Sequence, residues 1–147
     1  MKKAFSKLIG SALIAFVTTL PFTGSAQITG PSSSQSPYCV PVASGVSLTS
    51  ILSANDTVNG YRMSGIPDGL GAFDNGDATF TLLMNHEILS TLGVVRAHGS
   101  IGAFVSKWII NKQDLSVISG GDLMQSVYLW NEADNTYSYY SAANPSP

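Results

Sequence analysis

The sequence predicts an all-β protein made of consecutive antiparallel hairpins. Apolar residues in the body of the chain alternate with polar ones or occur in short β-branched runs, which is the pattern of strands and not of helices. Asn75-Gly76 separates two such runs, and Asn-Gly is a turn that accepts positive φ at both central positions of a tight hairpin. Hairpins that recur every few tens of residues are typical of propeller blades and of sandwich meanders, and the periodicity leaves both architectures open.

Residues 1–26 have the pattern of a signal peptide that is removed on export. Three lysines flank the start of a 13-residue apolar run from Leu8 to Leu20, and Gly24-Ser25-Ala26 is a small-x-small cleavage site. The apolar run is shorter than the ~20 residues that a membrane-spanning helix needs. The sequence therefore predicts cleavage near Ala26, export to the periplasm or the medium, and a mature chain of 121 residues without a membrane span.

The mature chain divides into three parts by composition. Residues 27–36 are rich in Gly, Pro, Ser and Gln and predict a flexible linker, whereas residues 141–147 form a tail of small and turn-forming residues. The domain between them, 37–140, is about a hundred residues long. Cys39 is the only cysteine, so an intramolecular disulfide is excluded, and its simplest role is that of a small hydrophobic residue.

Within the domain three hairpins follow one another. A β-branched run at 46–52 precedes them, and its strand or helical character stays open. The paired runs of the hairpins are 69–73 with 78–85, 101–110 with 115–118, and 127–130 with 136–140. A propeller blade needs ~40 to 50 residues, and a closed propeller needs about four blades or more. The domain is therefore long enough for two to three blades, which would make it a partial β-propeller.

The charge of the chain argues against two classes of partner. Without the signal peptide, four basic residues remain against nine acidic ones, a net charge of −5. Binding of nucleic acid or of an anionic membrane surface depends on clusters of Lys and Arg, which the mature sequence lacks. Polysaccharide binding, calcium binding and ordinary secreted solubility are all compatible with this composition.

Asn85-His86-Glu87 ends the longer strand of the first hairpin and is the first candidate site. Strand ends commonly carry sites because the sheet holds the backbone still. Neighbouring side chains of a strand point to opposite faces, so Asn85 and Glu87 share a face that His86 does not. Glu87 is thus the preferred metal ligand or acid-base group, although a solvated polar strand end explains the same residues. A zincin helix is excluded, because Ser90 stands where His-Glu-x-x-His requires its second histidine.

Further candidates lie before and after this strand. Asp68 follows a proline and precedes a glycine, and this tight turn presents its carboxylate as a hard oxygen ligand for calcium, although the sequence contains no EF-hand loop. Arg96 and His98 lie in a Gly-rich connection. The planar fork of Arg96 suits a phosphate or a carboxylate, and His98 is a candidate ligand or proton carrier. A structural salt bridge and loop hydrogen bonds are the alternative explanation for both residues.

The stretch from Gly65 to Asp77, continued by Thr79 to Glu87, resembles the N-terminal blades of the PhoX-type alkaline phosphatase family. Residues 96–108 and 115–123 extend the resemblance, which covers roughly 61–123, a little over half of the mature chain. It implies a secreted β-propeller that hydrolyses phosphate monoesters at a cluster of calcium and iron ions held by carboxylates and a cysteine. Such a cluster neutralises the phosphoryl oxygens and lowers the pKa of a bound nucleophile.

By this resemblance the chain is the N-terminal part of an exported, metal-dependent phosphomonoesterase that uses calcium, with iron as a further candidate. Glu87 matches a metal-ligand motif of the family, whereas the surroundings of Cys39 do not match its metal-bridging cysteine. Asn85 and Asp68 are the further candidate metal ligands. Arg96 and His98 are the catalytic candidates, in or near the same pocket. Because the family's other acidic ligands would lie downstream of residue 147, the chain by itself would be inactive.

A second function class follows from the third hairpin. It carries five aromatic residues, and exposed rings on strands form platforms on which sugar rings stack. These residues are Tyr128, Trp130, Tyr137, Tyr139 and Tyr140. A non-enzymatic exported module that binds a surface polysaccharide or a protein is therefore the alternative to the phosphatase. Burial of all five rings in a core would remove the basis of this alternative.

Overall fold

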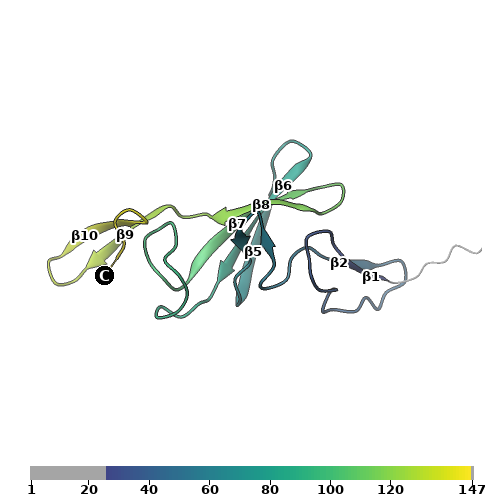
Figure 1. Cartoon of the computed structure of the whole chain (residues 1–147), viewed down its shortest axis with the longest axis horizontal. Coiled ribbons are helices and arrows are strands. Elements are labelled where there is room, and N and C mark those ends of the chain that lie inside the picture. The colour runs from purple at the N-terminus through teal and green to yellow at the C-terminus, as the bar shows by residue number, and fades with distance from the viewer. Residues whose placement is uncertain (1–25, 147) are drawn as a thin grey trace, which may run out of the picture.

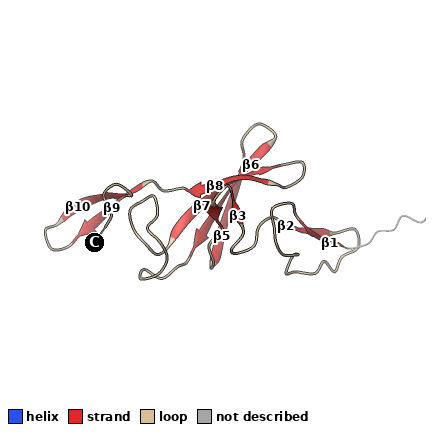
Figure 2. Cartoon of the chain, in the orientation of Figure 1, coloured by secondary structure: helices blue, strands red, loops and turns tan. Residues whose placement is uncertain are grey.

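The computed structural model describes residues 26–146 and consists, within that part, of strands, turns and connecting loops (Figures 1 and 2). The strands are β1 Ala26–Thr29, β2 Ser47–Ser50, β3 Thr57–Val58, β4 Tyr61–Arg62, β5 Pro67–Asp74, β6 Thr79–His86, β7 Phe104–Asn111, β8 Val117–Asp122, β9 Ser126–Asn131 and β10 Thr136–Ser141. The predicted all-β class with antiparallel hairpins is confirmed. In the described range no helix is long and apolar enough to cross a membrane. The predicted signal peptide lies outside the described residues, apart from Ala26.

The central element is a four-stranded antiparallel sheet in which β5, β6, β7 and β8 are neighbours in chain order. The first predicted hairpin forms β5 and β6, and the second forms β7 and β8. Pairing of β6 with β7 joins the two hairpins, with Leu82 opposite Trp108 and His86 opposite Phe104. The strands that pair here are separated by the long connection 87–103, so local turn signals do not predict their register.

The third predicted hairpin, β9–β10, is a separate two-stranded sheet. It lies at the opposite end of the molecule from the β1–β2 pair, with the central sheet between them (Figure 1). The sheets of residues 26–146 do not close into a propeller: β5–β8 has four strands, and the other three sheets have two each.

The core lies on one face of the central sheet, which we call the inner face. Burial alternates along β7 and places Phe104, Ser106, Trp108 and Ile110 on this face. The ring of Trp108 is fully buried among apolar neighbours from β6 and β8. Gly120 on β8 leaves the space for this ring, because a Cβ at that position would overlap the indole. The other, outer face is more open to solvent.

The tight turn with two positive φ values lies at a different Asn-Gly pair from the predicted one. Asn59 (φ 49°) and Gly60 (φ 84°) join β3 to β4, whereas at 75–76 only Gly76 has a positive φ. The β5–β6 loop is instead longer than a two-residue turn. The carboxylates of Asp74 and Asp77 accept hydrogen bonds from its backbone N–H groups, at 2.7 Å each. These two aspartates are therefore turn-forming residues.

The segment predicted as a flexible linker, 27–36, contains most of β1, which pairs in parallel with β2. Beyond β1, the Ser32 hydroxyl accepts a hydrogen bond of 2.9 Å from the backbone N–H of Val117 on β8, and Ser33 and Ser53 share a hydroxyl contact of 2.9 Å. Backbone pairing and hydroxyl contacts need no apolar side chain. A composition that predicts little burial therefore does not exclude them. The nearby Cys39 is exposed.

The predicted tail, 141–147, is tied to the connection between β6 and β7. The backbone N–H of Ala142 donates to the carbonyl of Ala97 at 2.9 Å, and the N–H of Ser146 donates to the carbonyl of Gly99 at 2.8 Å. Gly99 has a φ of 91° and lies against the backbone of Ser141, where a Cβ would overlap. The tail thus holds the base of the β9–β10 hairpin against the loop that contains Arg96.

Candidate functional site

The predicted residues at the end of β6 lie on the two faces of the central sheet. His86 is 1 % exposed and lies on the inner face, whereas Asn85 and Glu87 on either side of it are exposed. This alternation is that of a pleated strand. Asn85 and Glu87 line one hollow beside β7. They are the accessible pair of the three, and the prediction that they share a face is confirmed.

Asp68 lies across from this pair on the edge strand β5. The register of β5 against β6 shifts between Pro67 and Leu70, so Asp68 and Gly69 form an irregularity in the strand. The side-chain amide of Asn85 lies against Gly69, where an added Cβ would be 3.0 Å from Nδ2. Asp68 itself is exposed. The irregularity therefore brings Gly69, the neighbour of Asp68, into contact with Asn85, another predicted metal ligand.

His86 belongs to a buried chain of hydrogen bonds. Its Nε2 lies 2.8 Å from the hydroxyl of Ser106, which also accepts a hydrogen bond of 2.8 Å from the indole N–H of Trp108. Its Nδ1 lies 3.2 Å from the carbonyl of Gly65. A carbonyl can only accept, so Nδ1 carries the proton, and the Ser106 hydroxyl donates to Nε2. Burial, which removes the imidazole from water, lowers the pKa of His86 below its ordinary value and favours this neutral form.

Arg96 is packed against the same inner face. Its guanidinium stacks over the ring of Phe104 at 3.6 Å, and Phe104 stacks in turn on His86 with ring centroids 4.4 Å apart. The guanidinium donates to the hydroxyl of Ser64 at 2.7 Å and forms an ion pair of 3.5 Å with Asp122. Arg96 therefore makes the structural salt bridge that the sequence leaves open as one explanation for it.

Asp122 connects three segments that are distant in the sequence. Besides Arg96, it accepts a hydrogen bond of 2.5 Å from the hydroxyl of Tyr61 and one of 2.8 Å from the backbone N–H of Ala97. Burial, the hydrogen bond to Asp122 and the negative charge of that carboxylate together raise the pKa of Tyr61 well above its ordinary value. The Tyr61 phenol is thus a neutral donor that helps to hold the carboxylate in place.

A cleft of about 380 Å³ opens beside this network. It contains two guanidinium groups, since both Arg62 and Arg96 line it, together with Tyr61 and Ser64. Arg62 is exposed and donates to the side-chain carbonyl of Asn55. Asp122 offsets the charge of Arg96, so Arg62 supplies most of the net positive potential of the cleft. Phosphate or carboxylate groups are the ligands that guanidinium groups recognise best.

His98 is buried under the C-terminal tail and only 6 % exposed. Its Nδ1 is a buried side-chain nitrogen without a hydrogen-bond partner among the described residues. Arg96 and His98 are close together in the sequence, but in the structure only Arg96 lines the cleft. The single pocket predicted for Glu87, Arg96 and His98 is divided between the hollow beside β7, the cleft and a buried position.

The described residues do not fit a complete metal site. No group of three or more His, Cys, Asp or Glu side chains in 26–146 is arranged to hold a metal ion. Calcium takes about six to eight oxygen ligands. Asn85 and Glu87 offer suitable oxygens, but they are only two side chains on an open surface. We therefore derive no chemical step through calcium or iron.

Four of the five aromatic residues of the third hairpin are exposed, and Tyr140 is half-buried. Tyr128 and Tyr139 form one pair across the strands, with ring centroids 5.2 Å apart, and Trp130 and Tyr137 form a second pair at 5.1 Å. The rings do not form a core. Burial of all five rings would have removed the basis of the binding-module alternative, and the structure does not show it.

Sequence reasoning missed Tyr61, Arg62, Ser106 and the role of Asp122. Tyr and Ser at strand positions carry no pattern that separates a buried hydrogen bond from an ordinary surface residue. Tyr61 and Asp122 do lie near the two ends of the stretch 61–123 that resembles the phosphatase family. Their contact closes this stretch into one structural unit.

Comparisons of the chain with protein-family models, with curated proteins and with solved structures find no match. The resemblance to the PhoX-type family stays a prediction from the motif residues.

Proposed function

We propose that the chain is the N-terminal, partial-propeller part of an exported PhoX-like phosphomonoesterase, secreted or periplasmic, and that the phosphate group of its substrate binds in the cleft lined by Arg62 and Arg96. The proposal rests on one observation above others, which is that two guanidinium groups from distant parts of the chain line one cleft of about 380 Å³. This volume lies in the range of small-molecule sites.

The topology of the central sheet supports the propeller part of the proposal. A propeller blade is a four-stranded antiparallel sheet, and β5–β8 has four antiparallel strands in chain order. The stretch that resembles the phosphatase family, 61–123, runs from β4 through the end of β8.

The contacts of Arg96 leave it able to bind an anion. A guanidinium has five N–H donors in a fixed plane. Ser64 and Asp122 contact its two terminal nitrogens, each of which carries two protons. Stacking on Phe104 fixes the plane of the group. In this proposal Arg96 is an oriented phosphate-binding group, and Arg62 adds the uncompensated positive charge.

We assign no proton transfer to His98, because it is buried and does not line the cleft. Calcium is the proposed metal, and Asn85 and Glu87, which line the hollow beside β7 and not the cleft, are proposed as part of its ligand set. Iron is the weaker candidate, because Cys39 lies exposed on a different segment. The chain alone is therefore proposed to bind phosphate without substantial hydrolysis.

Titration of the mature chain with inorganic phosphate, followed by calorimetry, tests the cleft. We expect saturable binding that Arg62→Gln weakens about tenfold, since a hydrogen bond to a charged group contributes about 1.5–3 kcal/mol. Lys107→Gln is the matched control, because it removes one positive charge from an exposed position on β7. Equal loss of phosphate affinity in both variants would mean that the net charge of the protein, and not the cleft, causes the effect. Undiminished binding in Arg62→Gln would refute the assignment of the cleft.

A further inference from the structure

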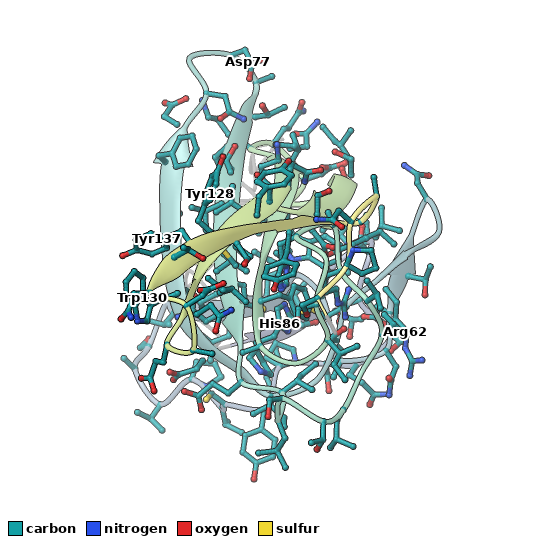
Figure 3. All side chains as sticks on the ribbon, turned by 90° about the vertical axis from the view of Figure 1, so that its left-hand side faces the viewer. Arg62, Asp77, His86, Tyr128, Trp130 and Tyr137 are labelled. Carbon is teal, nitrogen blue, oxygen red and sulfur yellow. The ribbon has the colours of Figure 1, made fainter. Side chains whose placement is uncertain are left out.

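The hairpin β9–β10 presents four aromatic rings on one face. Residues that pair across antiparallel strands lie on the same face, and residues two apart on one strand do so as well. Tyr128 pairs with Tyr139, and Trp130 pairs with Tyr137. All four rings therefore share one face, which we call the aromatic face. Figure 3 labels Tyr128, Trp130 and Tyr137, which lie near one another beside the hairpin.

The aromatic face is free of contacts with the other strands of the described chain. β9 and β10 pair only with each other, and the hairpin is attached to the rest of the molecule through the hydrogen bonds at its base. Tyr128 is 68 % exposed and Tyr137 is 67 % exposed. An exposed cluster of large apolar side chains on a secreted protein indicates an interaction surface.

Stability of the hairpin explains part of this arrangement, but not all of it. A two-stranded hairpin without a third strand is marginally stable, and the two cross-strand ring pairs offset this. The two most exposed of the four rings, Tyr128 and Tyr137, lie diagonally across the hairpin. Diagonal neighbours are roughly 7–8 Å apart, so both are accessible to one extended ligand.

The charge of the hairpin restricts the ligand. Residues 126–141 contain no Lys or Arg, and their two charged residues are the acids Glu132 and Asp134 in the turn. Anionic polymers are therefore repelled, and an acidic partner gains no ion pair. A neutral ligand with apolar faces and polar edges suits rings whose phenol and indole groups remain free to hydrogen-bond at the rim.

We propose that the aromatic face binds a neutral polysaccharide, with successive sugar rings stacked on Tyr128 and Tyr137. This binding does not depend on the phosphate cleft, which lies on different strands. It would attach the exported protein to a neutral polysaccharide surface.

Fluorescence of Trp130 tests the proposal on the unchanged protein. The chain has two tryptophans, and Trp108 is fully buried, so iodide quenching reports mainly on Trp130, which is 49 % exposed. The probe is cellohexaose, a soluble neutral glucan fragment, with polygalacturonate as the anionic comparator. We expect cellohexaose to protect Trp130 from iodide in a saturable manner and polygalacturonate to give no protection. Absence of protection by cellohexaose, or stronger protection by polygalacturonate, overturns the proposal.

Substitutions separate ring stacking from hairpin stability. The double variant Tyr128→Leu with Tyr137→Leu keeps apolar bulk and removes both π faces, and we expect it to bind microcrystalline cellulose at least about tenfold more weakly. Tyr128→Phe with Tyr137→Phe keeps the π faces and should retain binding. Tyr140→Leu is the control on the opposite face, opposite Val127 in the strand pairing. Equal binding by the Leu and Phe variants, or loss of a dimer in sedimentation on Leu substitution, would assign the face to another role.

Discussion

His86 and Ser106 share a hydrogen bond of 2.8 Å between Nε2 and Oγ, and both side chains are fully buried. A serine and a histidine at this distance are also the core of a nucleophilic dyad. Here the serine is 0 % exposed and already accepts a hydrogen bond from Trp108, so a substrate has no access to it. The pair is therefore a structural link between β6 and β7, at the polar end of the inner face.

Ser106→Ala should destabilise the fold strongly for its size. The substitution leaves the Trp108 indole N–H without its acceptor and His86 Nε2 without its donor, and each unpaired buried group costs about 1–3 kcal/mol. We expect a loss of about 2–4 kcal/mol in the free energy of unfolding, measured by urea denaturation. Ser126→Ala, at an exposed position of β9, should change this free energy by less than about 0.5 kcal/mol. Comparable values for the two variants would refute the structural link.

Stability should fall when the pH drops below the ordinary pKa of histidine. Burial holds the pKa of His86 in the folded state below its ordinary value of 6.5. The unfolded chain therefore binds a proton at a pH where the folded chain does not, and stability is constant above about 6.5 and declines as the pH falls toward the folded-state pKa. Carboxylates whose pKa is lowered in the folded state, such as that of Asp56, change the stability only at a lower pH, near or below their ordinary pKa of 3.8.

Urea denaturation at several values between about pH 5 and pH 8 measures this dependence. The variant His86→Gln should lose most of the slope between about pH 5 and 6.5, whatever its absolute stability. An unchanged slope in this variant would assign the titration to a group other than His86.

Two adjacent glycines on β8 should respond very differently to alanine. A Cβ at Gly120 overlaps the rings of Trp108 and Tyr61, whereas a Cβ at Gly121 meets nothing within 4 Å. Overpacking of a filled core costs about 1–3 kcal/mol, so Gly120→Ala should lower the thermal midpoint by several degrees. Gly121→Ala is the matched control and should leave the midpoint unchanged or slightly higher. A larger loss at Gly121 than at Gly120 would contradict the packing of Trp108.

Calcium should bind this chain weakly, if the metal part of the proposed function holds. Asn85 and Glu87 provide only part of a ligand set, so we expect a dissociation constant in the millimolar range, at the weak end of protein calcium sites. Calorimetric titration with and without Glu87→Gln measures it, and Glu132→Gln, in the β9–β10 turn, controls for loss of an acidic charge. Binding that persists in Glu87→Gln would remove Glu87 from the site.

The three hairpins could be predicted because each depends on turn residues and alternation within about twenty residues of chain. The division of Asn85 and Glu87 from His86 onto opposite faces followed in the same way from the period of a strand, whereas the sequence did not say which of the two faces is buried. The register of β6 on β7 could not be predicted, because it depends on burying Trp108 across a 17-residue connection, 87–103.

By itself the sequence determined the all-β class, the three predicted hairpins and the alternation of faces along β6, because these follow from local backbone preferences and a period of two. Only the tertiary structure decided what Arg96 contacts. Its ion pair with Asp122 and its cleft with Arg62 join residues far apart in the chain. Such contacts form only when packing around Trp108 aligns the strands, and no local pattern records that alignment.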